Sequence, residues 1–220
     1  MLKRCLKLLA CMVPAVFAVG CATQTAAPYD YTAFRASRPQ SIVVLPPLNN
    51  SPDVKATYSM FSQLTFPLAE AGYYVLPVTL VDETFKQNGL TSAADIHAVE
   101  AKKLRDIFGA DAALYVTITN YGSTYTVLNS VVVVAANAKL VDLKTGALLW
   151  EGSASASNEN NNNGGGGLLG ALVAAAVKQI INSTIDAAHP VAGVASLRML
   201  SAVRNNGLLY GPRSANYSKE

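Results

Sequence analysis

The sequence contains little cysteine, and this shortage limits the chemistry that the chain can perform. Three cysteines occur in 220 residues, and two of them, Cys5 and Cys11, lie within the first twenty. If those twenty residues are a removable signal, Cys21 is the only cysteine left. One cysteine is too few for an internal disulfide or for a cysteine-ligated metal site.

The chain is also short of net charge of either sign. Its formal charge of +3 comes from Lys3, Arg4 and Lys7, and the remaining residues carry fourteen basic against fourteen acidic side chains. No basic stripe is visible along the sequence. A nucleic acid or an anionic surface as partner would need such an excess or stripe, so we expect neither.

Sequence motifs of common enzymes are missing as well. No Gly-x-Ser-x-Gly nucleophile elbow occurs, and Gly164–Gly167 lacks both the Gly-Lys-Ser/Thr of a phosphate loop and the spaced glycines of a dinucleotide site. We therefore expect a protein that is not an enzyme and that needs no cofactor and no metal.

The first twenty residues have the organisation of a signal peptide. Three basic residues are followed by residues 8–19, an apolar or small run too short to span a membrane as a helix. Ala18-Val19-Gly20-Cys21 resembles the bacterial lipobox, which implies cleavage between Gly20 and Cys21. The resemblance implies diacylglycerol on the cysteine sulfur and a palmitate-type acyl group on the new amine. The alternative is a secreted protein in which Cys21 is incidental.

Residues 21–40 are predicted to be an acylated tether. Three acyl chains exceed the two signals that stable membrane anchoring requires. Ala22 rather than aspartate follows the cysteine, which by the same resemblance implies sorting to the outer membrane, on its periplasmic or its outer face. A flexible tether of this length spans roughly 25 Å, so we expect the domain to stay near its own leaflet.

Residues 41–77 predict a strand, a helix and a second strand. Residues 41–45 form a β-branched run that two prolines end, and residues 73–77 form another apolar run. Ser51-Pro52 has the pattern of a helix N-cap followed by proline. A right-handed crossover between the two strands predicts a parallel pair.

The helix after Ser51 should bury one apolar stripe and be interrupted once. Helical spacing places four side chains on that stripe and Leu64 at its margin. Pro67 predicts a kink or stop near Phe66, and Gly72 should end the element. The four stripe residues are Val54, Tyr58, Phe61 and Leu68.

Two further helices and three strands should follow. Residues 79–87 predict a short helix, and Ser92-Ala93-Ala94-Asp95 has the pattern of a capping box for one helix that ends at Phe108. The three predicted strands cover residues 112–125, 127–143 and 147–157, with turns at 120–123 and 144–146.

The predicted architecture is a single α/β domain over residues 41–205. It has a small mixed sheet, with a parallel strand-helix-strand start and an antiparallel meander, covered by helices. Residues 158–167 are low in complexity and predict a flexible Asn/Gly loop. Residues 190–203 suggest a final helix, and residues 206–220 predict a loosely ordered tail.

Three segments carry a resemblance to known envelope proteins. They are Ser41–Asn49, Gly109–Ile118 and Val141–Trp150. In this order they resemble the strands and hairpin of the curli-secretion lipoprotein CsgG, and the plan is similar to that of LpoB and of the TolB N-terminal domain. The whole chain most resembles a family of outer-membrane lipoproteins known as meningococcal surface antigens.

The resemblance implies a binding scaffold rather than an enzyme. It suggests a non-enzymatic accessory subunit of an envelope transport or secretion complex, with protein partners and contact to the membrane through the lipid anchor. The alternative is a regulator of peptidoglycan synthesis similar to LpoB, which a short tether disfavours. Pore formation is not carried over, because the strands lack the sustained alternation of an outer-membrane barrel.

His97 and Glu100 are the candidate residues for a catalytic or metal site. They are three residues apart on one side of a predicted helix, but a site needs at least one further ligand. The other histidine, His189, lies far along the chain. A hydrolase using His97 and Glu100 is therefore a third hypothesis, against the reading that both are ordinary polar residues.

The apolar residues 168–181 are the predicted contact surface for a partner or for a homodimer. Lys178 closes an apolar run of ten residues, half of what a membrane-spanning helix needs. A helix buried against the sheet and a membrane-facing helix are the alternatives. The residues proposed for this surface are Leu168, Leu169, Leu172, Val173 and Val177.

Overall fold

The computed structural model describes residues 28–125, 130–158 and 186–217. The signal peptide, Cys21, residues 159–167 of the Asn/Gly stretch and the apolar residues 168–181 lie outside the described part. The described elements pack around one continuous hydrophobic core.

The centre of the fold is one mixed β-sheet. Its strands are β1 (Ser41–Val44), β2 (Leu48–Asn49), β3 (Tyr74–Val75), β4 (Ala112–Tyr125), β5 (Ser130–Asp142) and β6 (Leu148–Ser157). The strand order is β3-β1-β4-β5-β6, and β2 pairs with β4. β1 is parallel to both β3 and β4, whereas β4, β5 and β6 form an antiparallel meander. The predicted mixed α/β sheet with a parallel start is thus confirmed.

β4 continues as one strand from Ala112 to Tyr125. The predicted turn at residues 120–123 is therefore wrong. The pairing of β4 with β5 shifts between Ile118 and Asn120, which marks a β-bulge. A one-residue shift exchanges the two faces of a strand. Ile118 and Tyr121 therefore both face the core, with 0% and 3% exposure.

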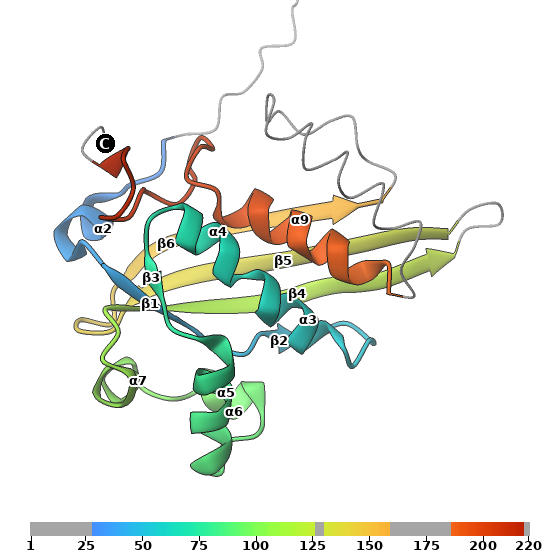
Figure 1. The fold of residues 1–220 in the computed structure, drawn as a ribbon, viewed down its shortest axis with the longest axis horizontal. Helices are drawn as coiled ribbons and strands as arrows, with labels where there is room; N and C mark the ends of the chain where they lie inside the picture. The colour runs from blue at the N-terminus through green and yellow to red at the C-terminus, as the bar shows by residue number, and fades with distance from the viewer. Residues whose placement is uncertain (1–27, 126–129, 159–185, 218–220) are drawn as a thin grey trace, which may run out of the picture.

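Three helices cover one face of the sheet (Figure 1). They are α3 (Ala56–Gln63), α4 (Thr65–Glu70) and α9 (Ala188–Leu200), and α9 packs along β5 and β6. We call this side the covered face. Every second residue of β5 is buried beneath it: Val132, Val134, Ala136, Ala138 and Leu140. Burial of these apolar side chains is the main stabilising contribution of the fold.

The other side of the sheet, which we call the open face, is covered only near β1 and β4. The elements there are α5 (Val78–Gln87), α6 (Ala93–His97) and α7 (Ala101–Phe108), which lie together below the sheet in Figure 1. On β5 and β6 this face is mixed: Asn137, Lys139 and Glu151 are exposed, whereas Val131 and Val133 are partly buried. Antiparallel strands with one solvated face show this alternation.

The predicted start of α3 at Ser51 is wrong. The Asn49 side chain accepts hydrogen bonds from the Ser51 N–H and hydroxyl, which holds Ser51 in a turn before the helix. The helix begins instead at Ala56, so its buried stripe is displaced. Val54 and Tyr58 were predicted to be buried but are 88% and 53% exposed.

The interruption predicted near Phe66 is present but lies two residues earlier, at Leu64. α3 ends at Gln63, whose carbonyl is the one that a proline at position 67 would meet in a continuous helix. Pro67 itself lies in the first turn of α4, where a missing N–H costs nothing.

The segment predicted as one helix from Ser92 to Phe108 is two helices, α6 and α7. Ser92 is the N-cap as predicted and accepts a hydrogen bond from the Ala94 N–H at 3.2 Å. Glu100 then adopts an extended conformation with ψ of 139°, which interrupts the helix. Ile96 and Leu104 would lie about 80° apart on one helix. The break allows both side chains to be buried.

The predicted boundary between tether and domain at residue 41 is wrong, because the fold begins at least twelve residues earlier. α2 (Thr32–Ser37) buries Phe34 to 4% exposure. The Tyr29 N–H donates to Asn206 Oδ1 at 2.9 Å, and the Tyr31 hydroxyl donates to the Gly207 carbonyl at 2.5 Å. A six-residue helix with one buried side chain gives no detectable period, which explains why the sequence pattern did not indicate it.

The prediction of a loosely ordered tail is wrong for residues 206–217. The Gly211 N–H donates to the Ala71 carbonyl at 2.7 Å, and the Arg213 N–H donates to the Gly72 carbonyl at 3.1 Å. Gly72 has a φ of +97°, and a Cβ there would lie 2.5 Å from the Ser214 nitrogen. Glycine is therefore required where the tail passes over the end of α4.

The motif residues have the structural roles that their types suggest. Asp142 is buried and accepts hydrogen bonds from the N–H groups of Lys144 and Thr145, at 2.8 Å and 2.6 Å. It also accepts from the Ser37 hydroxyl, which joins α2 to the β5–β6 hairpin. Burial raises the pKa of Asp142, but these hydrogen bonds outweigh it and the pKa lies below its ordinary value. Trp150 is buried against the C-terminal segment, to which its indole N–H donates at 3.2 Å.

Candidate functional site

Most residues that the sequence singled out lie outside the described part of the chain. These are the cleavage site at Gly20 and Cys21 and the predicted partner surface at Leu168, Leu169, Leu172, Val173 and Val177. They stay predictions.

His97 and Glu100 are described, and they do not form a pair. His97 Nε2 lies 3.0 Å from the Pro46 carbonyl, and its ring meets Tyr115 edge-on at 5.2 Å between ring centres. Burial lowers the pKa of His97, and the hydrogen bond to Pro46 opposes that effect in part. Glu100 is exposed at the break between α6 and α7. His97 is thus a packing residue on the open face, and the geometry does not support a hydrolytic pair.

A second polar cluster, which sequence reasoning missed, joins α3, α9 and β4. Ser59 Oγ lies 2.8 Å from His189 Nδ1 and accepts a hydrogen bond from the Tyr121 hydroxyl at 2.5 Å. His189 Nε2 lies 2.7 Å from Gln63 Nε2. If the amide nitrogen is the donor, His189 is neutral with its proton on Nδ1, donating to Ser59. Ser59 and His189 are 130 residues apart, so no local pattern could indicate their contact.

The chemistry of this cluster is that of a hydrogen-bonded core contact. A serine–histidine distance of 2.8 Å is suitable for nucleophilic catalysis. Gln63, however, occupies the place where a carboxylate would orient and charge-stabilise the imidazole. Tyr121 is 3% exposed, and burial is the main cause that raises its pKa, so its hydroxyl stays protonated. The cluster fastens α9 to α3 and leaves Ser59 Oγ engaged by two partners.

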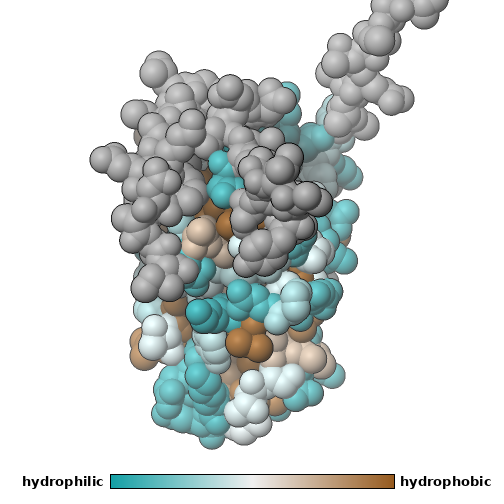
Figure 2. Space-filling view, turned by 90° about the vertical axis from the view of Figure 1, so that its right-hand side faces the viewer, coloured by the Kyte–Doolittle hydropathy of each residue, from teal (hydrophilic) through white to brown (hydrophobic). Residues whose placement is uncertain are grey.

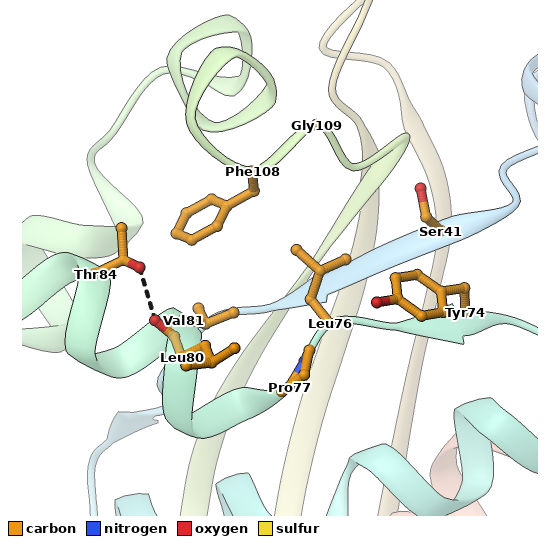
Figure 3. Close-up of a pocket in the computed structure, with 9 residues that line it drawn as sticks. All are labelled: Ser41, Tyr74, Leu76, Pro77, Leu80, Val81, Thr84, Phe108 and Gly109. Carbon is orange, nitrogen blue, oxygen red and sulfur yellow. Dashed lines mark hydrogen bonds between the residues drawn. The ribbon is translucent and has the colours of Figure 1, made fainter.

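A shallow groove lies on the open face of the described part of the chain. It has a volume of about 420 Å³ and lies between the β1–β3 edge of the sheet and helices α5 and α7 (Figure 3). The side chains of Leu76, Leu80, Val81 and Phe108 converge on it, and Tyr74 closes one end. Phe108 is fixed by an edge contact with Phe85, at 5.1 Å between ring centres.

The groove is apolar and adjoins the edge of the sheet. Leu80 is 64% exposed and Tyr74 is 46% exposed, although both are large apolar side chains. Tyr74 and Leu76 donate their N–H groups to β1, so strand alternation directs the N–H and carbonyl of Val75 to the outer edge. An apolar groove beside a strand edge is suited to an extended peptide segment, which can add backbone hydrogen bonds to side-chain contacts.

The described surface at the end of the molecule that carries the β4–β5 hairpin gives weaker support for a binding site than the groove does. Figure 2 views this end, and on its coloured surface hydrophobic side chains stand in small groups among hydrophilic ones. Exposed apolar residues scattered in this way are ordinary on a soluble surface.

The described residues provide neither a metal site nor a membrane span. Among them, no group of three or more histidine, cysteine, aspartate or glutamate side chains could hold a metal ion. In the same residues, no helix is long and apolar enough to cross a membrane.

Comparison with known proteins identifies relatives over most of the chain. Residues 29–213 match the family described as "Putative lipoprotein GNA1162-like". The lipoprotein NMB1124/NMB1162 of Neisseria meningitidis serogroup B is 52% identical over 193 residues, which is 88% of this chain and 89% of that protein.

One solved structure of the family agrees with this match, and a second structure is reported for its similarity alone. The crystal structure of lipoprotein GNA1162 from Neisseria meningitidis is 57% identical, with a TM-score of 0.54, and covers 66% of this chain and 100% of that one. The C-terminal domain of LpoB from Salmonella enterica is 20% identical, with a TM-score of 0.39, over 53% of this chain and 81% of that one.

Proposed function

The chain belongs to the GNA1162-like lipoprotein family, and from that premise we propose that it is an outer-membrane-anchored, non-enzymatic accessory subunit of an envelope transport or secretion complex. The anchor is the acylated Cys21, released as the new N-terminus by cleavage after Gly20. Three acyl chains make this attachment effectively permanent.

The groove on the open face is the observation that carries the proposal. Leu80 and Tyr74 are large, apolar and exposed at its rim, and Phe108 and Leu76 line its floor. Apolar groups that converge on an open groove are typical of surfaces that bind another protein. We propose that an extended segment of a partner protein fills this groove, with its backbone against Val75 at the edge of β3.

The proposal that the protein is not an enzyme is supported by how its polar residues are used. His97 is packed against Tyr115 and Pro46. Both ring nitrogens of His189 have neighbours at hydrogen-bond distance, in Ser59 and Gln63. The His97 imidazole therefore contributes to packing, and the His189 imidazole holds α9 against α3.

Regulation of a peptidoglycan synthase, the alternative role, gains no support from the fold boundary. The chain enters the fold at Tyr29, not after residue 40, so the tether is shorter than the sequence predicted. A domain held this close to its own membrane is poorly placed to reach an enzyme in another one.

In-cell photo-crosslinking of the full lipidated protein tests the proposal. A photoreactive residue at Leu80 should give an adduct with one envelope protein, identified by mass spectrometry. Val54 is the matched control position, since it is also apolar and exposed but lies at the start of α3. The variant Phe108→Asp should abolish the Leu80 adduct, because a carboxylate cannot be desolvated in the groove.

Two outcomes would change the interpretation. Adducts of the protein with itself would establish a homodimer through the groove. No protein adduct at Leu80 beyond that at Val54 would overturn the groove as the contact surface. A third photoreactive position at Leu172 tests the predicted surface outside the described residues.

A further inference from the structure

We propose that the end of the domain where the two chain termini meet lies on the anionic headgroups of the membrane that holds the anchor. The inference rests on the lipid anchoring in the proposed function and adds an orientation and a lipid class to it. The surface concerned adjoins the groove at Tyr74, over whose ring the Arg213 guanidinium lies at 5.1 Å.

Charge is distributed unevenly between the chain ends and the rest of the fold. Residues 28–40 and 198–217 carry five arginines and a single acidic residue, Asp30. The remaining described residues carry seven basic and eleven acidic side chains. The five arginines are Arg35, Arg38, Arg198, Arg204 and Arg213. The near-neutral net charge is therefore the sum of a basic excess in the two terminal segments and an acidic excess in the other described residues.

The fold brings these arginines together although they are far apart in sequence. The Arg35 guanidinium lies 5.9 Å from the centre of the Tyr31 ring, and the Tyr31 hydroxyl donates to Gly207. Gly207 in turn donates its N–H to the carbonyl of Arg204. Arg38 Nε donates to the Arg35 carbonyl at 3.3 Å. These contacts place Arg35 and Arg38 on α2 near the backbone of Arg204, where the chain enters the fold. α2 lies at the left of Figure 1.

These arginines keep N–H groups for an external anion, although Arg38 Nε donates to the Arg35 carbonyl and Arg204 Nη1 donates to the Arg198 carbonyl. Arg35, Arg38 and Arg204 are exposed. In the part of the chain that the structure describes, none of them forms an ion pair with a carboxylate. Asp30 and Glu151 lie within electrostatic range of Tyr29. Asp142 and Asp111 accept hydrogen bonds from Ser37 and Gln40, at the C-terminal end of α2. These two carboxylates are held by hydrogen bonds within the fold, whereas the three arginines are exposed.

The length of chain before the fold keeps this end near the membrane. Tyr29, the first residue with a contact to the C-terminal segment, follows Cys21 by eight positions. In any conformation eight steps along the chain span at most about 28 Å. A compact fold of this size has a radius of gyration of about 15 Å and hence a diameter of roughly 39 Å, so the tether is too short to let the far end of the domain lie on the membrane.

The side chains at this end suit a lipid surface. Arginine binds phosphate through two parallel hydrogen bonds, which lysine cannot do. Val203 is 71% exposed beside Arg204, and Tyr217 is 40% exposed in the same C-terminal segment. Apolar and tyrosine side chains next to basic residues are typical of a membrane interface. The expectation from sequence that no anionic surface is a partner is revised by this arrangement.

Fluorescence quenching of the lipidated protein in vesicles tests the orientation. The variant Val203→Cys gives the acylated chain one free thiol, which is labelled with an environment-sensitive dye. Vesicles contain a headgroup quencher and either zwitterionic lipid alone or about 30% phosphatidylglycerol. We expect quenching at position 203 to rise at least about twofold with the anionic lipid and to fall again at about 0.5 M salt.

Matched variants separate this inference from anchoring itself. The triple variant Arg35→Gln, Arg38→Gln, Arg204→Gln should lose the phosphatidylglycerol-dependent quenching. Removal of three charges from α7, by Lys102→Gln, Lys103→Gln and Arg105→Gln, should preserve it. A dye at Val54→Cys should show little quenching throughout. Trp150 fluorescence checks that each variant is folded, and flotation with the vesicles reports the lipid anchor independently.

Two results would overturn the inference. One is equal quenching at positions 203 and 54. The other is quenching at position 203 that depends neither on anionic lipid nor on the three arginines. Failure of flotation would instead contradict the lipid anchor on which the proposed function depends.

Discussion

On the covered face of the sheet, α3, α4 and α9 bury one side chain in two along β5 and β6, and the polar groups that remain are hydrogen-bonded to one another. On the open face, the described helices contact β1 and β4, and on β5 exposed side chains such as Lys139 alternate with the covered positions, next to partly buried ones such as Val133. The same strands thus bury apolar side chains on one side and are partly solvated on the other. Stability should depend mainly on the covered face and binding on the open one, and substitutions can test that division.

Trp150→Ala should have the largest effect. Trp150 is 1% exposed on the covered face, and truncation of a buried aromatic side chain costs about 3–5 kcal/mol in the free energy of unfolding. Leu148→Ala is the control on the same strand, since Leu148 is 43% exposed and its truncation should cost about 0.5 kcal/mol or less. Urea denaturation followed by circular dichroism measures both. Similar losses for the two variants would contradict the comparison.

Tyr121→Phe, on the covered face, should lower the free energy of unfolding by less than Trp150→Ala but by more than a matched change on the open face. It removes the hydroxyl that donates to Ser59 Oγ, and a buried hydrogen bond of this kind contributes about 1 kcal/mol. Tyr115→Phe is the control on the open face, where the hydroxyl has no hydrogen-bond partner among the described residues. Its change should stay within about 0.5 kcal/mol. Thermal unfolding of both proteins at pH 7 makes the comparison, and a larger loss for Tyr115→Phe would reverse it.

His97, on the open face, should make the stability of the fold depend on pH. Burial depresses the pKa of His97 below the ordinary value of 6.5, so the unfolded chain binds a proton more readily than the folded one. Stability should therefore fall as the pH drops below about 6.5 and should be unaffected by His97 above it. His97→Gln should flatten that decline in denaturant midpoints measured between about pH 7 and pH 5. An unchanged slope would assign the decline to other groups.

Leu80→Ser should change stability least while altering binding. Leu80 is 64% exposed at the rim of the groove, so its replacement should cost about 0.5 kcal/mol or less. The yield of the partner crosslink, formed from a photoreactive residue at neighbouring Thr84, should nevertheless fall severalfold. Retained crosslinking with unchanged stability would mean that Leu80 contributes neither to stability nor to partner binding.

Local patterns predicted the elements whose signals lie within a few residues. β-branched runs located β1 and β4, and Ser92 located the start of α6. Predictions failed where a neighbouring turn used the capping group, as Asn49 does with Ser51. The strand bulge after Ile118 likewise has no sequence signature of its own.

The candidate sites were less predictable because they are assembled from distant segments. Ser59 meets His189 across 130 residues, and the arginines of the two chain ends meet only after the whole fold has formed. The groove combines β3, α5 and α7, whose apolar residues look like ordinary core positions in the sequence. Helical or strand periodicity reports which face of an element is apolar, but not which element covers it.

The contact between Tyr29 and Asn206 also sets an order of events during folding. These residues are 177 positions apart, so the N-terminal segment has no place to dock until nearly the entire polypeptide has been made. Loops closed over such separations form late. The segment that begins at Tyr29 therefore docks after the rest of the fold, and the domain closes over its own beginning in the last step of folding.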